Sequence, residues 1–497
     1  MSLGQLVLYI GIVALVFMGI HLAIGKKMPA KWMSFLQYFT GSLFVFSGWV
    51  KAIDPLGTAY KMEQYFAEFE ITFQDTWLSF IAPVFPWFSE LSIAFSVFMI
   101  ILEIVLGFML LIGAFKRFTS WVFFLMILFF TFLTGFTFLT GYVPGGENFF
   151  NFSAWQSYDP NNMRVTDCGC FGDFIKLEPK VSFFKDVFLL IPALLFLVFH
   201  EKMHSWLESK QQLMGIGVLA FLLLVYSMSN YVWDLPHIDF RPFKEGVNVA
   251  ERKAIESESM ANVQVTAFML EDLTTGELIE VPYNEYLAGI SEKYSKDKYK
   301  VQGQVTSKPE VEPTKISDFS FMDQEGNDIS ADFLTESGKK LLLVGHKVPY
   351  TTKMTEVIVF DTLYSVDTVF VEQGDSTSYE LVKKIEDVQE RTEEKTEYIF
   401  KPSFLEKWRE AAVTAKNLSD QGVETLALLG GVGSEAIEAF AKQIGATFSI
   451  YDADDILLKT IVRSNPGYVA WDGGEIIGKW HYRKVSDEKL QEAFQTK

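Results

Sequence analysis

The sequence predicts a polytopic α-helical membrane bundle of about six transmembrane helices, followed by a soluble α/β domain. Six apolar runs, each near the ~20 residues that cross a bilayer, are confined to the first 235 residues. After that point strand-like and helix-like segments alternate, which is typical of an α/β sheet. The composition also turns acidic there, because the net charge is near −3 up to residue 235 and near −16 beyond it, for a total of −19.

The apolar runs predict the positions of the membrane helices. The fifth run is short and contains Pro192, which a helix in lipid tolerates when its neighbours satisfy the freed carbonyl. The first run has no basic stretch before it, so we expect a retained helix rather than a cleaved signal. The six predicted helices are Leu3–Ile24, Met33–Ile53, Leu91–Phe115, Phe118–Tyr142, Phe183–His200 and Leu213–Val232.

The loop charges predict the orientation of these helices. Basic residues gather after the first, third and fifth runs, as in Lys26–Lys31, Lys116–Arg117 and Lys202–Lys210. Loops rich in lysine and arginine stay in the cytoplasm. We therefore expect both termini, the loop after the fourth run and everything after Val232 to lie outside the cytoplasm.

The chain divides into five predicted parts. The first is a transmembrane helix with a cytoplasmic loop, the second a bundle with a long outer loop, and the third a cytoplasmic loop with the last transmembrane helix. An outer connector and the α/β domain follow. Their bounds are 1–32, 33–200, 201–234, 235–315 and 316–497.

Two smaller features are predicted in the second half. Ala267–Val281 has two alternating segments around a Thr-Thr-Gly-Glu turn, which indicates a β-hairpin. Residues 355–400 interrupt the α/β pattern as an insertion. Within it, alternation predicts a strand at Val357–Val371, and a charged run predicts a helix at Glu380–Lys395.

The two cysteines of the chain, Cys168 and Cys170, are the sharpest candidates for chemistry. A disulfide across one glycine closes a small strained ring, and strained disulfides are the labile ones. An outer compartment permits oxidation. Three interpretations stand: a redox-active pair, a static disulfide or thiol pair that pins the loop, and half of a metal site. The third lacks further ligands, because no histidine lies nearby in the sequence.

Glu103 is the second candidate, because it lies inside the third apolar run. An ionisable group at membrane depth is costly and is a functional candidate by default. The alternatives are a structural pair with Lys51 or a place in a polar seam of the bundle.

Three segments of the first half resemble the DoxX and MauE families of bacterial membrane proteins. They are Ser47-Gly-Trp-Val-Lys-Ala-Ile-Asp-Pro55, Glu103-Ile-Val-Leu-Gly107, and Cys168-Gly-Cys-Phe-Gly-Asp173, which precedes a helix with Lys185-Asp186. The resemblance covers about residues 33–200. It implies a four-helix core linked to redox or disulfide chemistry outside the cytoplasm. By analogy with disulfide-generating membrane bundles it also implies a quinone as electron acceptor, although no second cysteine pair exists here.

The last domain resembles thioredoxin-like folds of the TlpA type. The matching segments are Ile316-Ser-Asp-Phe-Ser-Phe321, as an opening strand, and Arg463-Ser-Asn-Pro-Gly467. Asn465 and Pro466 take the place of the cis-proline loop that borders the binding groove of such domains. The turn Gly345–Pro349 has no cysteine where the family's nucleophile would sit, so the domain has no dithiol chemistry of its own.

Two hypotheses about function follow. The first is a thiol-disulfide oxidoreductase of the bacterial inner membrane, in which Cys168 and Cys170 exchange disulfides with a periplasmic protein that the C-terminal domain recruits. The second is a non-enzymatic scaffold or assembly factor of the cell envelope, in which the cysteine loop is structural. Nucleic acid is excluded as a partner, because an acidic domain repels phosphates. The sequence shows no metal site.

Overall fold

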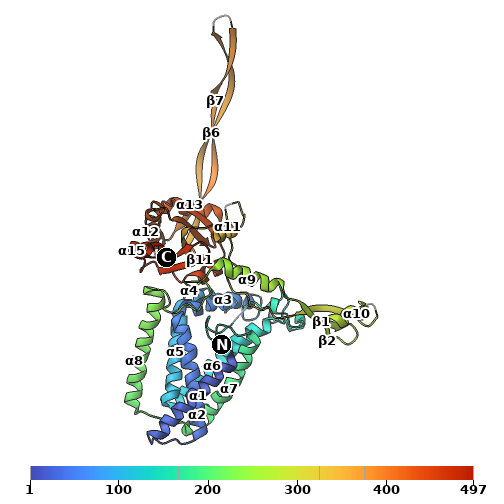
Figure 1. The fold of residues 1–497 in the computed structure, drawn as a ribbon, viewed down its shortest axis with the longest axis vertical. Coiled ribbons are helices and arrows are strands. Elements are labelled where there is room, and N and C mark those ends of the chain that lie inside the picture. The colour runs from blue at the N-terminus through green and yellow to red at the C-terminus, as the bar shows by residue number, and fades with distance from the viewer. Residues whose placement is uncertain (1, 166–167, 291, 324, 374–375, 496–497) are drawn as a thin grey trace. The chain divides into compact units, whose positions relative to one another are not determined.

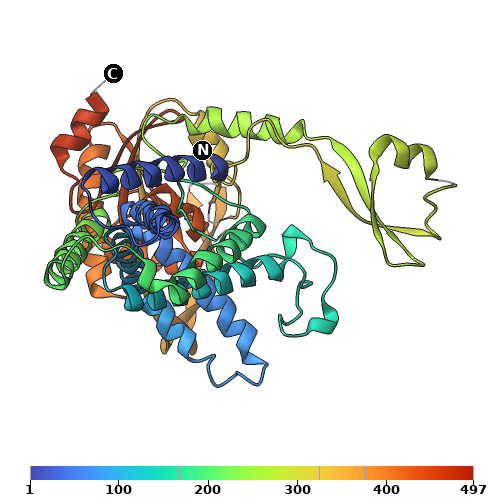
Figure 2. The same ribbon diagram turned by 90° about the horizontal axis from the view of Figure 1, so that it is seen from below.

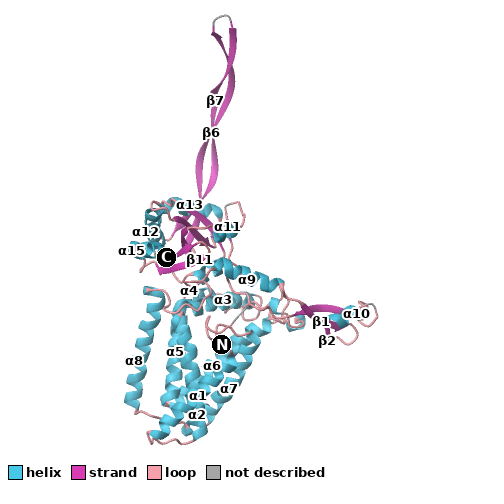
Figure 3. Ribbon diagram, in the orientation of Figure 1, coloured by secondary structure: helices cyan, strands magenta, loops and turns pink. Residues whose placement is uncertain are grey.

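The computed structural model describes residues 2–165, 168–290, 292–323, 325–373 and 376–495 (Figure 1). The chain forms two compact units. The first comprises Met1–Val247 with two short later segments, Thr460–Ser464 and Lys479–Ser486. The second comprises Asn248–Lys459, Asn465–Gly478 and Asp487–Lys497. Up to Val247 the described residues form helices, turns and loops, and the strands all come later (Figure 3).

Five described helices are long and apolar enough to cross a membrane, which confirms a membrane-embedded helical part. They begin where the chain supplies caps. Ser2, for example, forms a capping box with Gln5 at the start of the first helix. Figure 2 views these helices from below. They are α1 (Leu3–Ala23), α5 (Ser92–Ile112), α6 (Lys116–Thr140), α7 (Pro179–Val198) and α8 (Ser209–Met228), whose apolar span continues to Trp233.

The sixth predicted span is a helix of 23 residues, α2 (Lys31–Ile53), but it is less apolar than the other five. Its sequence explains the difference, because the buried side chains of α2 include many polar groups. These groups face the interior of the bundle rather than lipid, so the mean hydropathy of the helix falls. The buried polar side chains are Ser34, Gln37, Tyr38, Thr40, Ser42, Ser47 and Lys51.

Glycines let α2 and α5 approach each other to backbone contact. A Cβ atom on Gly41 would lie 2.8 Å from the carbonyl oxygen of Gly107, and one on Gly107 would lie 2.8 Å from the carbonyl oxygen of Gly41. A Cβ on Gly48 would lie 2.4 Å from Cγ1 of Ile104. Lipid provides no hydrophobic driving force between helices, so their association depends on close van der Waals packing. Small residues at the crossing allow that packing. Any side chain at these positions would push the two helices apart.

Two further helices follow α2. Asp54 caps α3 (Pro55–Gln74) by accepting a hydrogen bond from the Gly57 backbone, and Pro55 takes the first helical position, where its missing N–H costs nothing. The short α4 (Val84–Glu90) comes next. The aromatic faces of α3 and α4 meet, as the 5.6 Å between the ring centroids of Phe69 and Phe85 shows.

The second unit is built on a six-stranded sheet with the order β11-β10-β5-β8-β9-β4. β5 pairs parallel with β8, and β8 with β9, whereas β10 and β4 are antiparallel to their partners β5 and β9. The parallel strands are buried apolar runs, which is how such strands read when both faces are covered. The bounds are β4 (Phe321–Met322), β5 (Lys339–Gly345), β8 (Glu424–Gly430), β9 (Ser449–Ala453), β10 (Gly467–Asp472) and β11 (Glu475–His481).

Aromatic clusters form the core of this unit. Trp408, on α12, packs against Phe440, on α13, with ring centroids 5.4 Å apart. Trp471, on β10, packs against Phe333 at 5.3 Å. This arrangement confirms an α/β domain after the membrane helices. Its helices are α11 (Ser330–Thr335), α12 (Pro402–Ser419), α13 (Ser434–Ile444), α14 (Asp455–Ile461) and α15 (Asp487–Gln495).

Two predicted elements of this domain are wrong. The opening strand expected at Ile316–Phe321 contains turns, and the strand β4 is limited to Phe321–Met322. The charged run Glu380–Lys395 is not a helix but part of β7 (Ser376–Phe400), which pairs antiparallel with β6 (Tyr350–Gln373). A charged run is typical of a solvent-exposed helix, but pairing with β6 along its whole length makes this segment a strand.

The connector is more ordered than its sequence suggests. Helix α9 (Val249–Ala261) leads into a three-stranded sheet of order β2-β1-β3 (Figure 2). The predicted hairpin at Ala267–Val281 is confirmed as β1 (Val265–Asp272) and β2 (Leu278–Pro282), with Asp272 accepting two backbone hydrogen bonds in the turn. Helix α10 (Tyr283–Gly289) and the unpredicted strand β3 (Tyr299–Thr306) complete it.

Removing the distal part of the β6–β7 hairpin should leave the α/β domain folded. Replacement of Thr355–Lys395 by an Asn-Gly turn keeps the hydrogen bond of 3.0 Å from Tyr398 to Glu435 and the packing of Phe400 against Phe440, with ring centroids 5.2 Å apart. We expect an unchanged thermal midpoint for the soluble domain and an unchanged pattern in limited proteolysis. In the intact hairpin, Phe400→Ala should instead destabilise the domain by roughly 3 kcal/mol. A lower midpoint for the shortened chain would show that the hairpin supports the fold.

Candidate functional site

The loop that carries the two cysteines sits against α2 and α3. It runs between α6 and α7 and contains two 3₁₀ turns, Phe152–Ala154 and Pro160–Asn162. Gly169 and Gly172 have left-handed backbone angles, with φ of 59° and 52°, which favour glycine. The carbonyl of Cys170 accepts a hydrogen bond of 2.8 Å from the Ser47 hydroxyl on α2. The glycines and this bond fix the path of the Cys-Gly-Cys turn.

Both cysteines are thiols in this structure, and both are partly buried. Cys170 packs against the apolar core of the bundle, and its neighbour Phe171 is 2 % exposed within that core. Asp167, which precedes the pair in the sequence, lies outside the described residues. Asp173, which follows it, is 3.8 Å from the ammonium of Lys176.

Two buried ion pairs lie inside the bundle next to this turn. Glu103, on α5, accepts a hydrogen bond of 2.7 Å from Lys51, on α2, and both side chains are under 10 % exposed. On α7, Lys185 and Asp186 pair at 2.5 Å, and the Asp186 side chain is 1 % exposed. The structure therefore places the predicted residue Glu103 in a pair with Lys51, one of the alternatives that the sequence left open. Buried charges at membrane depth are expensive and are found where function requires them.

The four charged side chains act on the Cys170 thiol. Burial raises the pKa of this thiol, Lys185 and Lys51 lower it, and Asp186 and Glu103 raise it. The net direction is upward, so Cys170 is protonated at neutral pH. Thiolate is the reactive form of cysteine. The positive charge of Lys185 favours the thiolate of Cys170 and so opposes the effect of burial on its pKa.

A buried arginine ties the aspartate of the cysteine loop to the start of α3. Arg463 belongs to the short segment Thr460–Ser464 of the first unit and is 5 % exposed. Its guanidinium lies 2.8 Å from the Asp54 carboxylate and 3.6 Å from that of Asp173. The ring of Tyr60 lies 5.1 Å from it. Asp54, before the start of α3, and Asp173, in the cysteine loop, thus share one cation.

The predicted groove residues Asn465 and Pro466 lie in the second unit, next to the turn after β5. The peptide bond between them is cis. The Asn465 amide donates a hydrogen bond to the carbonyl of His346, and Gly467 pairs with Val344 of β5. The backbone of Lys347 donates to Asp455 at 2.6 Å. This loop cluster has the polar groups of a binding groove and no thiol.

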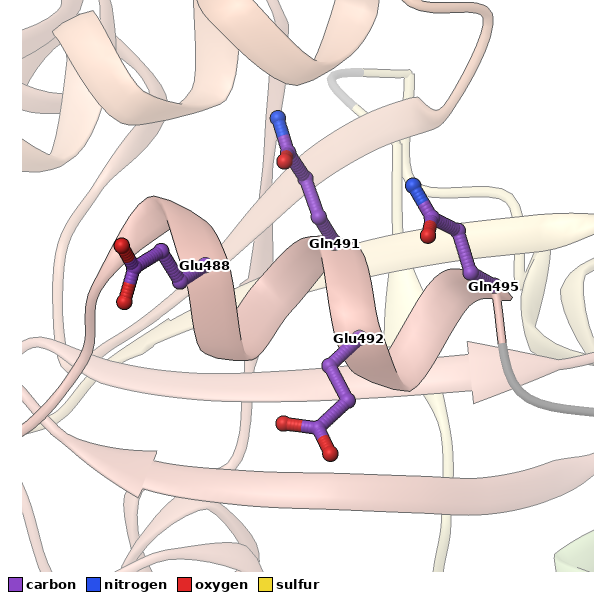
Figure 4. A pocket seen from close by; sticks show the side chains of 4 residues that line it. All are labelled: Glu488, Gln491, Glu492 and Gln495. Atoms are coloured by element: carbon purple, nitrogen blue, oxygen red, sulfur yellow. The ribbon is translucent and has the colours of Figure 1, made fainter.

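Two surface depressions are not candidate functional sites. One, of about 370 Å³, is lined by Glu488, Gln491, Glu492 and Gln495, all on α15. Figure 4 shows Gln491 and Glu492 pointing to opposite sides of that helix, so the four do not converge on a ligand. The other, of about 410 Å³, lies between α3 and the loop after α6, where Arg164 approaches Glu68 at 3.8 Å. Neither depression is lined by a cysteine.

A cluster of buried aromatic and imidazole groups lies among the basic loops of the bundle. The Trp206 indole donates to Nδ1 of His21 at 3.0 Å, so the proton of that ring is on Nε2. His204 donates from Nε2 to the Leu111 carbonyl at 3.0 Å, so its Nδ1 is an acceptor. His204 Nδ1 is buried and has no hydrogen-bond partner among the described residues. Burial lowers the pKa of His204 to about 4.

Sequence reasoning missed three parts of these sites. Lys185 and Asp186 were seen only as part of a resemblance, although charges inside an apolar run were the same signal that singled out Glu103. Arg463 was not connected to the cysteine loop, because 290 residues of chain separate it from Asp173. His21 and His204 lie in separate loops and helix ends, and no spacing brings them together.

Comparisons with protein-family models, with curated proteins and with solved structures found no match to this chain.

The Lys51–Glu103 pair should be costly to break and cheap to remove. Glu103→Gln leaves the Lys51 ammonium buried without a counter-charge, and we expect roughly 3 kcal/mol of destabilisation, seen as a lower thermal midpoint in detergent. The double variant Lys51→Met/Glu103→Leu should recover most of that loss, because apolar replacement removes both desolvation costs. Equal loss in the single and double variants would contradict this.

The stability of the bundle should fall as the pH drops from about 6.5 to about 4. His204 has a lowered pKa of about 4, so an unfolded chain binds a proton at this residue before the folded chain does. The contribution of neutral His204 to the free energy of unfolding is complete above pH 6.5 and decreases by up to about 3 kcal/mol on acidification to pH 4. Thermal unfolding of the wild type and of His204→Gln, measured from pH 7 to pH 4, should show a steeper decrease for the wild type. Parallel stability curves for the wild type and for His204→Gln would contradict this prediction.

Proposed function

We propose that the chain is a DoxX/MauE-like, redox-associated protein of the bacterial inner membrane that exchanges or maintains disulfides outside the cytoplasm through Cys168 and Cys170. The observation that carries the proposal is the position of Cys170, a thiol seated on the helical bundle beside two buried ion pairs. A purely structural loop does not need four buried charges next to its cysteine, because such charges cost stability in a membrane.

The proposed orientation counts α2 as a sixth span. Six spans put the basic loops with Lys26, Lys116 and Lys202 on the cytoplasmic side. They put both termini, the cysteine loop and the α/β domain in the periplasm. An oxidising compartment of that kind allows a cysteine pair to cycle.

The C-terminal domain is proposed to be thioredoxin-like and non-catalytic. Its central parallel strands β5 and β8, the antiparallel strands β10 and β11 beside them and the cis-proline loop against the end of β5 support this interpretation. Because the domain has no cysteine, its loop at Asn465 and Pro466 would hold a partner protein rather than react with it.

The proposal covers exchange with a protein partner and no step through a quinone. A relay from the cysteine pair to a quinone normally uses a second pair, which the chain lacks.

A second candidate function is a membrane-anchored scaffold of the cell envelope. The observation that favours it is the β6–β7 hairpin, with strands of 24 and 25 residues that contain many exposed apolar side chains, among them Met354, Ile358 and Phe360. In this reading the cysteine loop is static.

A redox titration separates the two candidates. Membranes with the full-length protein are equilibrated at defined potentials, and thiols are trapped by alkylation and counted by mass. We expect a midpoint between roughly −120 and −270 mV, the range of exchange catalysts. Cys170→Ser should accumulate mixed disulfides through Cys168, and Cys168→Ser should not. A pair that stays oxidised below about −300 mV, or never forms a disulfide, would leave the scaffold.

A further inference from the structure

Two adjacent residues of α7, Lys185 and Asp186, act electrostatically on the Cys170 thiol, and Asp186 is also held by a residue of α6. The Lys185 ammonium lies 2.5 Å from one oxygen of Asp186 and 5.8 Å from the ring centroid of Phe171, the residue after Cys170. The other oxygen of Asp186 accepts a hydrogen bond of 3.0 Å from the Thr134 hydroxyl on α6. Both ends of this pair are therefore fixed.

The charged groups that face the sulfur come from three helices. They are Lys51 on α2, Glu103 on α5, and Lys185 and Asp186 on α7. The set has two positive and two negative members, so it adds no net charge to the bundle. Charges arranged in this way stabilise the bundle little, but each one changes the energy of a nearby anion by an amount that depends on its own distance.

We propose that Lys185 and Asp186 are positioning residues with opposite effects, which together set the protonation of the Cys170 sulfur and make it the leaving group of disulfide exchange. This inference rests on the proposed function. It assigns Cys168 as the sulfur that a client attacks and Cys170 as the sulfur that receives the electron pair. Thr134 holds the Asp186 carboxylate, and Ser47 holds the backbone carbonyl of Cys170.

The exchange then proceeds in two balanced steps. A client thiolate attacks the Cys168 sulfur of the Cys168–Cys170 disulfide, the S–S bond breaks, and its electron pair goes to Cys170 next to the Lys185 ammonium. Cys170 takes up a proton equivalent to one that the client's thiols released. The second client thiolate attacks the client sulfur of the mixed disulfide and releases Cys168. The client has lost two electrons to the cysteine pair, and no other reactant is needed.

The Lys185 charge matters because Cys170 is partly buried against the apolar core of the bundle. A thiolate leaving into an apolar core would be a poor leaving group, since leaving is slower for a thiol of higher pKa. Lys185 compensates for the developing charge, and Asp186 keeps the ammonium from pairing permanently with the thiolate. Removing Lys185 should therefore raise the pKa of the Cys170 thiol, and removing Asp186 should lower it.

The test is the pH dependence of Cys170 alkylation in full-length Cys168→Ser protein, reconstituted in lipid. A small neutral maleimide is the probe, and the extent of labelling is measured by mass. We expect Lys185→Gln to move the midpoint up and Asp186→Asn to move it down, each by about one pH unit. Lys180→Gln removes an exposed charge from the same helix and should leave the midpoint unchanged. Lys185→Arg should keep the wild-type profile.

Opposite shifts support the proposal, because a loss of structure would move both variants in the same direction. Shifts of the same sign, or none, overturn it. If one single variant fails to assemble, Lys185→Gln/Asp186→Asn takes its place, and its midpoint should lie near that of the wild type. The labelling needs no client, so it can succeed where the redox titration fails. If the redox titration fails but the alkylation midpoints of the two variants shift in opposite directions, only the proposed disulfide exchange is rejected. The effect of Lys185 and Asp186 on Cys170 then stands.

Discussion

The backbone contact between α2 and α5 is the constraint on which the rest of the helical unit depends. Gly41, Gly48 and Gly107 leave no room for a side chain between the two helices. At this separation the Lys51 side chain reaches Glu103 directly, at 2.7 Å. The same face of α2 carries Ser47, which holds the carbonyl of Cys170. A wider crossing would break the ion pair and release the cysteine turn together.

The cysteine loop is therefore positioned by groups of different kinds. Left-handed glycines shape the turn, a hydroxyl from α2 fixes its carbonyl, and Arg463 holds Asp173 at its end. The charges that act on the Cys170 thiol come from other residues, among them Lys185 and Asp186 on α7. The groups that shape the turn are therefore distinct from the groups that act on its charge.

How much of this could be predicted varies with the type of signal. Apolar runs identified the membrane helices, and the Thr-Thr-Gly-Glu turn identified β1 and β2, because both signals are local. Glu103 was found as an isolated charge in an apolar run, and Lys51 was already named as its alternative partner. The run Glu380–Lys395 is a strand rather than the helix that its charge predicts, because a partner strand determines the structure of this segment. Contacts across long stretches of chain, such as Arg463 with Asp54 or His204 near His21, leave no local pattern to detect.

The length of the β6–β7 hairpin gives the second unit an extended reach. Strands of 24 and 25 residues extend for about 80 Å at the rise per residue of a β-strand. A partner bound along the distal part of the hairpin would remain tethered to the membrane-bound chain. Binding at a second point would then be intramolecular, and its strength would depend on the local concentration that this tether sets. Shortening the hairpin would change that concentration without altering any binding surface near its base.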